Sequence, residues 1–247
     1  MNTERAWKLF ITGFTDTATA RRSASRFRAG PLAAVRFSRG EQSGTPFEEF
    51  FVYDCDPSQA LIALSKARRL ARHYLTVLED RPGLREAYQN AGYRLVDTEA
   101  LMACNLSAVP PPIPDHAVTV VQTQAEADWY NSNDPQGIHW IMPDNLADPR
   151  MRHYAIVADG QIRARGRNLR LDAHHSYVSR VFVAEAHRGR GLARALMLQL
   201  LNDDMAGGIH WSVLTASRMG IPLYTRLGYQ TFAMILNFER LPSNPYS

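Results

Sequence analysis

The chain has 247 residues, of which 45% are hydrophobic and 21% are charged, with a formal net charge of +4. This length accommodates one large domain or two small ones, and the apolar content excludes wholesale disorder. No stretch reaches the roughly 18 uninterrupted apolar residues that a membrane span needs. The opening residues, MNTERAWKLFITGF, lack the apolar core and cleavage site of a signal peptide. We therefore expect a cytoplasmic protein with no membrane partner.

Cysteine and arginine usage narrows the function classes further. Cys55 and Cys104 are too few for a disulfide framework or a four-thiolate zinc site, and we expect both to be buried as small apolar residues. The 28 basic residues include only two lysines, and the arginines are dispersed along the chain. Dispersed arginines are more typical of genomic composition than of a nucleic-acid-binding tract, so we expect no nucleic-acid partner.

The first half of the chain predicts a helix, a strand and a second helix. The strand covers residues 47–54 (FEEFFVYD) and the second helix covers 57–73, with no glycine-rich turn between them. Four aromatic and apolar side chains at helical spacing predict an N-terminal helix that packs in the core: Trp7, Phe10, Ile11 and Phe14.

A proline-rich segment separates the two halves of the sequence. Residues 107–116 read SAVPPPIPDH, and prolines at this density cannot continue a helix or an interior strand. We interpret the segment as an extended linker between a domain over 1–106 and a domain over 117–247.

The second half predicts alternating strands and helices, which indicates an α/β or α+β domain. Asp159-Gly160 is a strong signal for the turn of a hairpin. The predicted elements are a strand over 117–121, a helix over 122–130, a loop with broken helix to 150, a hairpin over 153–166, a strand over 176–183, a helix from 193, a strand over 210–214, a short helix over 220–227 and the last strand or strands over 229–239.

The end of the first half resembles the end of the second. Residues 73–106 can be laid beside 209–239, with Tyr88 opposite Tyr224 and other identities at the same offset. A shorter offset at the end predicts extra residues in a hairpin of the first copy. We interpret the pattern as an internal duplication; the alternative is that strand–helix–strand units often look alike.

The most informative segment follows the strand that ends at Val183. Residues 188–193 read RGRGLA and lead directly into a helix. Glycines let the backbone approach a ligand closely, and the first amides of a helix have no partner within the helix. This geometry binds phosphate groups at the positive end of the helix dipole, and Arg188, Arg190 and Arg194 add positive charge beside it.

Two phosphate-binding patterns are absent, the P-loop G-x-x-x-x-G-K-[ST] and the dinucleotide pattern G-x-G-x-x-G. The pattern that is present, R-x-x-G-x-A, resembles the coenzyme A signature Q/R-x-x-G-x-G/A of the GNAT N-acetyltransferase superfamily. Arg188, Gly191 and Ala193 fill its defined positions. Residues 223–229 (LYTRLGY) resemble a second motif of that superfamily, L-Y-x-x-L-G-F/Y, at the family's spacing. The resemblance covers about 117–239.

The resemblance implies two GNAT-like domains, each a mixed, mostly antiparallel sheet flanked by helices. The second domain would be catalytic and would use acetyl-CoA as co-substrate. The first has no coenzyme A signature, which makes it a degenerate GNAT-like domain that covers the sheet or shapes the acceptor cleft. No histidine spacing resembles a zinc site, so no metal is expected.

The resemblance also assigns roles to single residues. Tyr224 matches the tyrosine that protonates the departing thiolate, whereas Tyr88 would pack in the core. The strand before the glycine-rich turn would offer an open backbone edge to the pantetheine arm. The residues expected to contact the coenzyme are Val181, Phe182, Val183, Arg188, Gly189, Arg190, Gly191, Leu192, Ala193, Arg194 and Ser217.

The general base is harder to assign. Tyr177 stands where histone-acetylating members of the family have a glutamate, and Glu185 stands in the turn, where solvation is the better interpretation. His175 shares a strand face with Tyr177, and histidine is a common general base in enzymes, so it is a candidate base, although a surface histidine is the plainer interpretation.

Aromatic residues gather where the family builds its acceptor pocket. Trp129, Tyr130, His139 and Trp140 could hold an amine by cation–π contact, or could form a small core under a loop.

The leading hypothesis is an N-acetyltransferase that moves an acetyl group directly from acetyl-CoA to a primary amine of a small molecule. The alternatives are a protein acetyltransferase acting on N-termini or lysines, and a module that binds acyl-CoA without catalysis. The sequence leaves open whether the protein is a monomer or a homodimer.

Overall fold

The computed structural model describes residues 1–20, 24–38, 45–67, 70, 72–112 and 116–240. The elements of the first half are α1 (Thr3–Thr19), β1 (Ala24–Ala29), β2 (Leu32–Phe37), β3 (Phe47–Val52), α2 (Pro57–Lys66), β4 (His73–Glu79), α3 (Leu84–Asn90), β5 (Tyr93–Asn105) and the 3-10 turn η1 (Leu106–Ala108). Those of the second half are β6 (Thr119–Val120), α4 (Gln124–Ser132), α5 (Pro143–Ala147), β7 (Met151–Ala158), β8 (Gln161–Arg170), β9 (His175–Val183), η2 (Glu185–His187), α6 (Leu192–Ala206), β10 (Trp211–Ser217), α7 (Ile221–Arg226) and β11 (Gln230–Arg240).

The strands form one continuous sheet of 11 strands in the order β1-β2-β3-β4-β11-β5-β10-β9-β8-β7-β6. Strands β1 to β5 have counterparts in β7 to β11, in the same order. If the short edge strand β6 is left out and each strand is replaced by its counterpart, the order read backwards equals the order read forwards. The segments that resemble each other in sequence form the same elements, β4-α3-β5 and β10-α7-β11. The two predicted sheets are therefore joined, and the mixed, mostly antiparallel pairing is confirmed.

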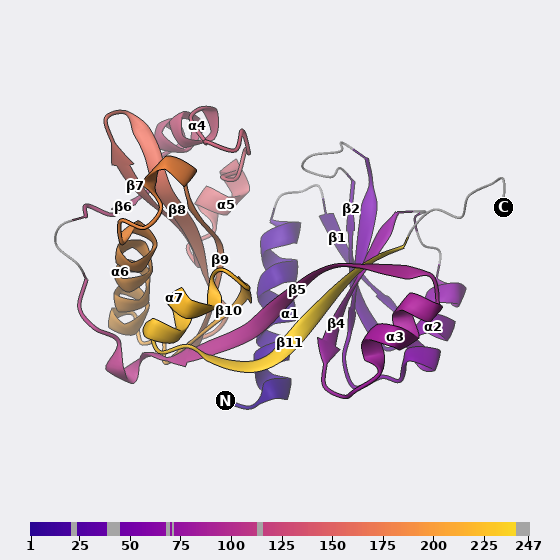
Figure 1. Cartoon of the computed structure of the whole chain (residues 1–247). Helices are drawn as coiled ribbons and strands as arrows, with labels where there is room; N and C mark the ends of the chain where they lie inside the picture. Colours follow the sequence, from indigo (N-terminus) through magenta and orange to yellow (C-terminus); the bar gives the residue numbers. More distant parts are fainter. Residues whose placement is uncertain (21–23, 39–44, 68–69, 71, 113–115, 241–247) are drawn as a thin grey trace.

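Two long strands, β5 and β11, run through both halves of the molecule (Figure 1). The C-terminal part of β5 pairs with β10, and the C-terminal part of β11 pairs with β4. The side chains follow the same exchange. Met102 and Cys104 of β5 lie in the core under α6, and Leu236 and Phe238 of β11 lie in the core of the first half. The hairpin in which extra residues were predicted at the end of the first copy does not form, because β5 is a single strand from Tyr93 to Asn105.

Local signals account for most of the elements. Thr123 and Glu126 form a capping box that starts α4, and Asp159 and Gly160 both adopt positive φ in the turn between β7 and β8, as the hairpin prediction requires. Both cysteines are buried and unpaired, as expected. Within the described ranges, no helix is long and apolar enough to cross a membrane.

The helix predicted over 57–73 is shorter than expected and ends at Lys66. A buried carboxylate competes for the backbone beyond it. Glu48 on β3 is fully buried, accepts the Leu70 amide at 2.8 Å and pairs with Arg36. His73 already belongs to β4, opposite Glu48. The sheet, rather than a longer helix, therefore uses these backbone groups.

Helix α1 packs across the centre of the sheet, between the two halves (Figure 1). The side chains predicted to face the core do so, with Trp7 and Phe10 almost fully buried. Gly13 is the point of closest approach, because a Cβ atom there would lie 2.2 Å from the Tyr177 ring. A glycine inside a helix costs roughly 1 kcal/mol relative to alanine, and here it provides the space for Tyr177.

Gly13→Ala tests this packing. We expect a loss of about 1–3 kcal/mol in the free energy of unfolding, because the added methyl group must displace Tyr177 or the helix. Thr12→Ala, at an exposed position of the same helix, is the control and should change stability by no more than a few tenths of a kcal/mol. Urea unfolding curves measure both, and equal stability of the two variants contradicts the account.

Candidate functional site

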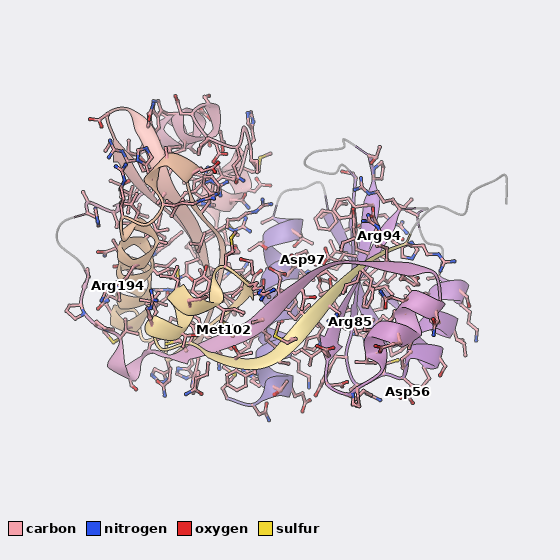
Figure 2. All side chains as sticks on the ribbon, in the orientation of Figure 1. Asp56, Arg85, Arg94, Asp97, Met102 and Arg194 are labelled. Atoms are coloured by element: carbon pink, nitrogen blue, oxygen red, sulfur yellow. The ribbon has the colours of Figure 1, made fainter. Side chains whose placement is uncertain are left out.

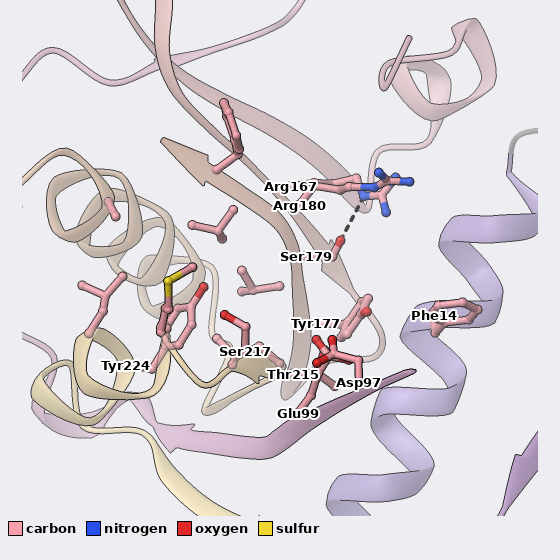
Figure 3. Close-up of a pocket in the computed structure, with 18 of the residues that line it drawn as sticks. Phe14, Asp97, Glu99, Arg167, Tyr177, Ser179, Arg180, Thr215, Ser217 and Tyr224 are labelled. Atoms are coloured by element: carbon pink, nitrogen blue, oxygen red, sulfur yellow. Dashed lines mark hydrogen bonds between the residues drawn. The ribbon is translucent and has the colours of Figure 1, made fainter. Parts of the chain in front are cut away.

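An open cavity of about 1480 Å³ lies where the two halves meet. Residues from β9, β10, α6 and α7 form one end, and residues from α1, β3, β4 and β5 form the other. Figure 3 shows Tyr224 on one side of this space and Phe14 on the other. In Figure 2, Arg194 lies by α6 at one side and Asp97 on β5 near the middle of the molecule. The first half therefore supplies walls of the cavity.

Strand β9 leaves its neighbour β10 inside the cavity. The two strands pair in parallel only from His175 to Tyr177, opposite Trp211 to Val213. The next six residues of β9, Val178 to Val183, all line the cavity. In a regular strand successive side chains face opposite sides, so an unbroken run of lining residues means that the backbone edge itself faces the cavity.

A β-bulge shapes the same stretch. The register between β8 and β9 shifts opposite Gly166, and Arg180 on β9 adopts a φ of 60°. Such a φ is uncommon for a residue other than glycine, and bulges re-aim the residues around them. Here the bulge lies in the part of β9 that has left β10.

The glycine-rich turn forms a cradle at the end of the cavity. Gly189 and Gly191 have φ values of 75° and 79°, a region that disfavours side chains with a Cβ atom. The first helical hydrogen bond of α6 is from the Ala195 amide to the Gly191 carbonyl, which leaves the preceding amides of the first turn without helical partners. This turn supplies the donors that an anionic group requires.

All but one of the residues predicted to contact the coenzyme line this cavity. Arg190 is the exception, because it is exposed and does not line it. Arg188 and Arg194 do line it, and the Arg188 Nε atom donates to the Val183 carbonyl at 3.3 Å. Ser217 lies at the end of β10, beside the turn into α7.

Tyr224 on α7 faces the same cavity (Figure 3). Its side chain is 8% exposed, and burial, followed by the nearby charge of Glu99, raises its pKa to about 12. The phenol therefore keeps its proton throughout the neutral pH range. Its counterpart Tyr88 is fully buried against Tyr93 and Phe238 in the first half, as predicted.

The structure separates His175 from the cavity. His175 lies at the start of β9, in the stretch that still pairs with β10, and its Nδ1 atom donates to Asp172 at 2.7 Å. It does not line the cavity. Sharing a strand face with Tyr177 therefore does not bring His175 to the cavity, because the cavity opens only where β9 and β10 separate.

The aromatic residues proposed for an acceptor pocket form a separate small core. Trp140 is fully buried with Tyr130 under α4 and α5, and Trp129 is partly exposed on the surface. None of these side chains lines the cavity. Of the two interpretations, the structure supports the small core under a loop.

Three carboxylates that sequence reasoning missed line the cavity, Glu49, Asp97 and Glu99. Glu99 on β5 accepts hydrogen bonds from Asn237 at 3.2 Å and Thr215 at 3.3 Å, and burial raises its pKa. Glu49 on β3 accepts from Thr76 at 2.7 Å, and burial raises its pKa to about 7, with a smaller contribution from Glu99. The sequence signal that could have identified these residues is an acidic residue within an otherwise apolar strand.

Two arginines lie beside these carboxylates. Arg167 on β8 and Arg180 on β9 line the cavity, and burial lowers the pKa of both. Tyr177 lies between them and Glu99 (Figure 3). Within the described parts of the chain, no group of three histidine, cysteine or acidic side chains could hold a metal ion.

Among the described residues of the first half there is no equivalent of this cradle. Strand β3 pairs with β4 up to its end at Val52, so no backbone edge opens. Helix α2 starts with Pro57, which has no amide proton, and Asp54 and Asp56 place negative charge before it. The surroundings of this helix start therefore oppose a phosphate group.

Comparisons with known proteins agree with this geometry. Residues 120–229 match the sequence model of the Acetyltransferase (GNAT) family. No curated protein sequence matches the chain. A GCN5-related N-acetyltransferase from Kribbella flavida superposes with a TM-score of 0.71 at 19% identity, covering 99% of this chain and 97% of that one.

Two further structures share the fold. A GCN5-related N-acetyltransferase from Sphaerobacter thermophilus superposes with a TM-score of 0.62 at 17% identity, over 86% of this chain and 78% of that one. A tandem GNAT protein from the clavulanic acid biosynthesis pathway superposes with a TM-score of 0.52 at 12% identity, over 98% and 97%. The parted strands and the glycine cradle lie within residues 120–229, the segment that matches the GNAT family model, and the chain shares its fold with these GNAT structures.

Proposed function

We propose that the protein is an acetyl-CoA-dependent N-acetyltransferase that acts on a primary amine of a small molecule, by direct transfer in a ternary complex. The observation that carries the proposal is the open edge of β9, which leads into the glycine cradle at the start of α6. The family match covers this same region. The second half, 117–247, would be the catalytic domain.

The residues present fit the coenzyme. At Val181, Phe182 and Val183 the edge of β9 that faces away from β8 would offer backbone groups to the pantetheine arm. The free amides at the start of α6 would hold the pyrophosphate, with charge support from Arg188 and Arg194. When bound, acetyl-CoA would supply the acetyl group as a thioester.

Glu99 is the best-placed group to remove the proton of the acceptor amine. A primary amine is protonated at neutral pH and must lose a proton before it can form the new N–C bond. Glu99 lines the cavity near Tyr224, and two hydrogen bonds from Thr215 and Asn237 fix its position. Its raised pKa makes it a stronger base than an exposed carboxylate.

Tyr224 would act on the leaving sulfur. Its neutral phenol can donate a hydrogen bond to the sulfur as the C–S bond breaks, and a proton to the thiolate that forms. The raised pKa makes complete transfer to a thiolate uphill, since thiols have a reference pKa of about 8.5. We therefore assign Tyr224 mainly to hydrogen bonding while negative charge develops on the sulfur.

The first half would then define the acceptor site without binding coenzyme. It supplies Glu49 and Glu99, and its helix α1 and strand β3 bound the far end of the cavity. Walls on several sides support a small-molecule acceptor over an extended peptide. We propose that this half, over 1–106, is a degenerate copy of the GNAT unit, joined to the second half through residues 107–116.

Tyr224→Phe removes only the phenol hydroxyl. We expect kcat to fall about 100-fold with little change in acetyl-CoA affinity, because the hydroxyl acts as the C–S bond breaks. Tyr88→Phe, the matched change in the first half, should leave kcat unchanged. Steady-state kinetics on both variants test this prediction. An unchanged kcat for Tyr224→Phe would show that the hydroxyl does not act on the leaving sulfur.

Gly191→Val places a branched side chain at a backbone position with positive φ in the cradle. We expect acetyl-CoA affinity to fall at least about 10-fold, since the amides must move. Gly208→Val is the control, because Gly208 has a φ of 83° at the opposite end of α6, with open space around it. Calorimetric titration should give one site per wild-type chain, and equal affinities of the two variants would be evidence against the cradle.

Glu99→Gln keeps the shape of the side chain and removes the base. In the wild type, kcat/KM should rise with pH through the raised pKa of Glu99, because only the carboxylate accepts a proton. Other titratable groups face the same region: Glu49, Asp97, Tyr177 and Tyr224. Because Glu49 has a pKa of about 7, its ionisation should also contribute to the rise of kcat/KM with pH.

The variant should lower kcat about 100-fold and flatten the rise of kcat/KM with pH. Glu86→Gln, at an exposed position of α3, is the control and should keep the wild-type profile. A pH profile of Glu99→Gln that matches the wild type assigns the base elsewhere.

A further inference from the structure

The cavity contains a buried cationic group that the proposed reaction does not use. Arg167 is 3% exposed and lines the cavity. Its Nε atom donates to Ser179 Oγ at 3.1 Å, and its Nη1 atom is buried with no hydrogen-bond partner. Within the described parts of the chain, Arg167 has no ion-pair partner. An unpaired buried charge is costly, so its presence requires an explanation.

A neighbouring arginine shows what structural pairing looks like in this strand. Arg165, two residues earlier on β8, donates from Nε to Asp134 at 2.5 Å, from Nη2 to Gln136 at 2.7 Å and from Nη1 to the Arg180 carbonyl at 3.1 Å. Arg165 is therefore satisfied by the protein itself. Arg167 has one hydrogen bond to a neutral hydroxyl, which leaves much of its guanidinium for another partner.

Its surroundings favour an anion. Burial, and then the positive charge of Arg180, lowers the pKa of Arg167 to about 9. A bound carboxylate would stabilise the charged form and satisfy the free N–H groups. A guanidinium presents paired donors that match the two oxygens of a carboxylate.

The two kinds of charge lie on different sides of one residue. Figure 3 shows Arg167 and Arg180 on one side of Tyr177, and Glu99 and Asp97 on the other. Burial is the main cause that raises the pKa of the Tyr177 hydroxyl. The two arginines lower this pKa, whereas Glu99 and Glu49 raise it further, so both kinds of charge act on the same hydroxyl. A molecule that matches this part of the cavity carries both a cationic and an anionic group.

We propose that the acceptor is an amino carboxylate, with its amine directed to Glu99 and its carboxylate bound by Arg167. The inference rests on the proposed function for the amine half and adds the substrate class. It predicts that amines without a carboxylate are poor acceptors, because they leave the Arg167 guanidinium buried and unpaired.

Aromatic side chains border the same end of the cavity. Phe37 and Phe47 stack with ring centroids 4.4 Å apart, and Phe14 of α1 packs edge-on against Phe37. These rings offer an apolar wall to the rest of the acceptor. An amino acid with an apolar side chain, such as phenylalanine or leucine, therefore suits the first tests.

The first experiment measures binding without turnover. Unfolding temperatures are recorded with coenzyme A and either L-phenylalanine or L-phenylalaninamide, and again with the leucine pair. We expect the amino acids, and not the amides, to raise the unfolding temperature of the wild type and of Arg152→Gln, a surface control outside the cavity. Arg167→Met should lose the shift. Absence of a carboxylate-dependent shift in the wild type overturns the inference.

The unfolding temperature of ligand-free Arg167→Met tests whether Arg167 is needed for stability. If Arg167 exists to bind a ligand, removing a buried unpaired charge should leave the unfolding temperature of the free protein unchanged or higher. A marked decrease assigns Arg167 to the structure and overturns the inference. Arg167→Lys, which keeps the charge and loses the paired donors, should recover only part of the ligand-induced shift.

The second experiment measures acetyl transfer to phenylalanine, phenylalaninamide and phenethylamine. We expect kcat/KM for the amino acid to exceed the other two by about 100-fold, and Arg167→Met to remove the preference. Equal values for all three overturn the inference. If no amine is acetylated while the carboxylate-dependent shift persists, the proposed function fails and the binding inference stands.

A carboxylate could also belong to the acyl group. Succinyl-CoA tests this source. If Arg167→Met lowers kcat/KM for succinyl-CoA and the wild type shows no preference among the acceptors, the carboxylate site serves the acyl chain. That outcome overturns the assignment to the acceptor.

Discussion

The exchange of β5 and β11 between the halves is the constraint on which the rest of the molecule depends. Strand β5 follows helix α3 of the first half but completes the sheet and the core of the second half. Strand β11 follows helix α7 of the second half but completes the sheet and the core of the first. The same exchange assembles the cavity. It brings Glu99 of β5 alongside β10, while Tyr224 sits on the helix between β10 and β11. The backbone hydrogen bonds of the sheet thus hold Glu99, and the short helix between two of its central strands holds Tyr224.

The cavity concentrates charge that a fold selected for stability alone would pair or remove. Glu49 has a pKa of about 7 and Arg167 one of about 9, and in both cases burial is the main cause. Helix α1 adds to this, since Gly13 lets it approach close enough to cover Tyr177. Electrostatic interactions strengthen as water is excluded, so the arrangement that destabilises these groups also makes their contacts with a ligand stronger.

The sequence located the end of the cavity with the glycine cradle far better than the end formed by the first half. Residues 188–193 and 223–229 are local motifs, and local motifs fix local geometry, so the cradle and Tyr224 lie where they were expected. His175 was misplaced because its position depends on where β9 parts from β10, a tertiary feature. Glu49, Glu99 and Arg167 come from strands of different halves, and nothing in their spacing shows that the sheet is continuous. The strand exchange was missed for the same reason, although the repeat pointed to related units.

The position of β11 also sets the order in which the protein can fold during synthesis. The core of the first half includes Leu236 and Phe238, which leave the ribosome after every other strand of the sheet. Until then, β4 has no partner on its inner side, and its open edge must remain exposed. Domains usually fold in order from the N-terminus. Here the first half cannot complete its core before the second has been made, so the native sheet closes only once β11 has emerged.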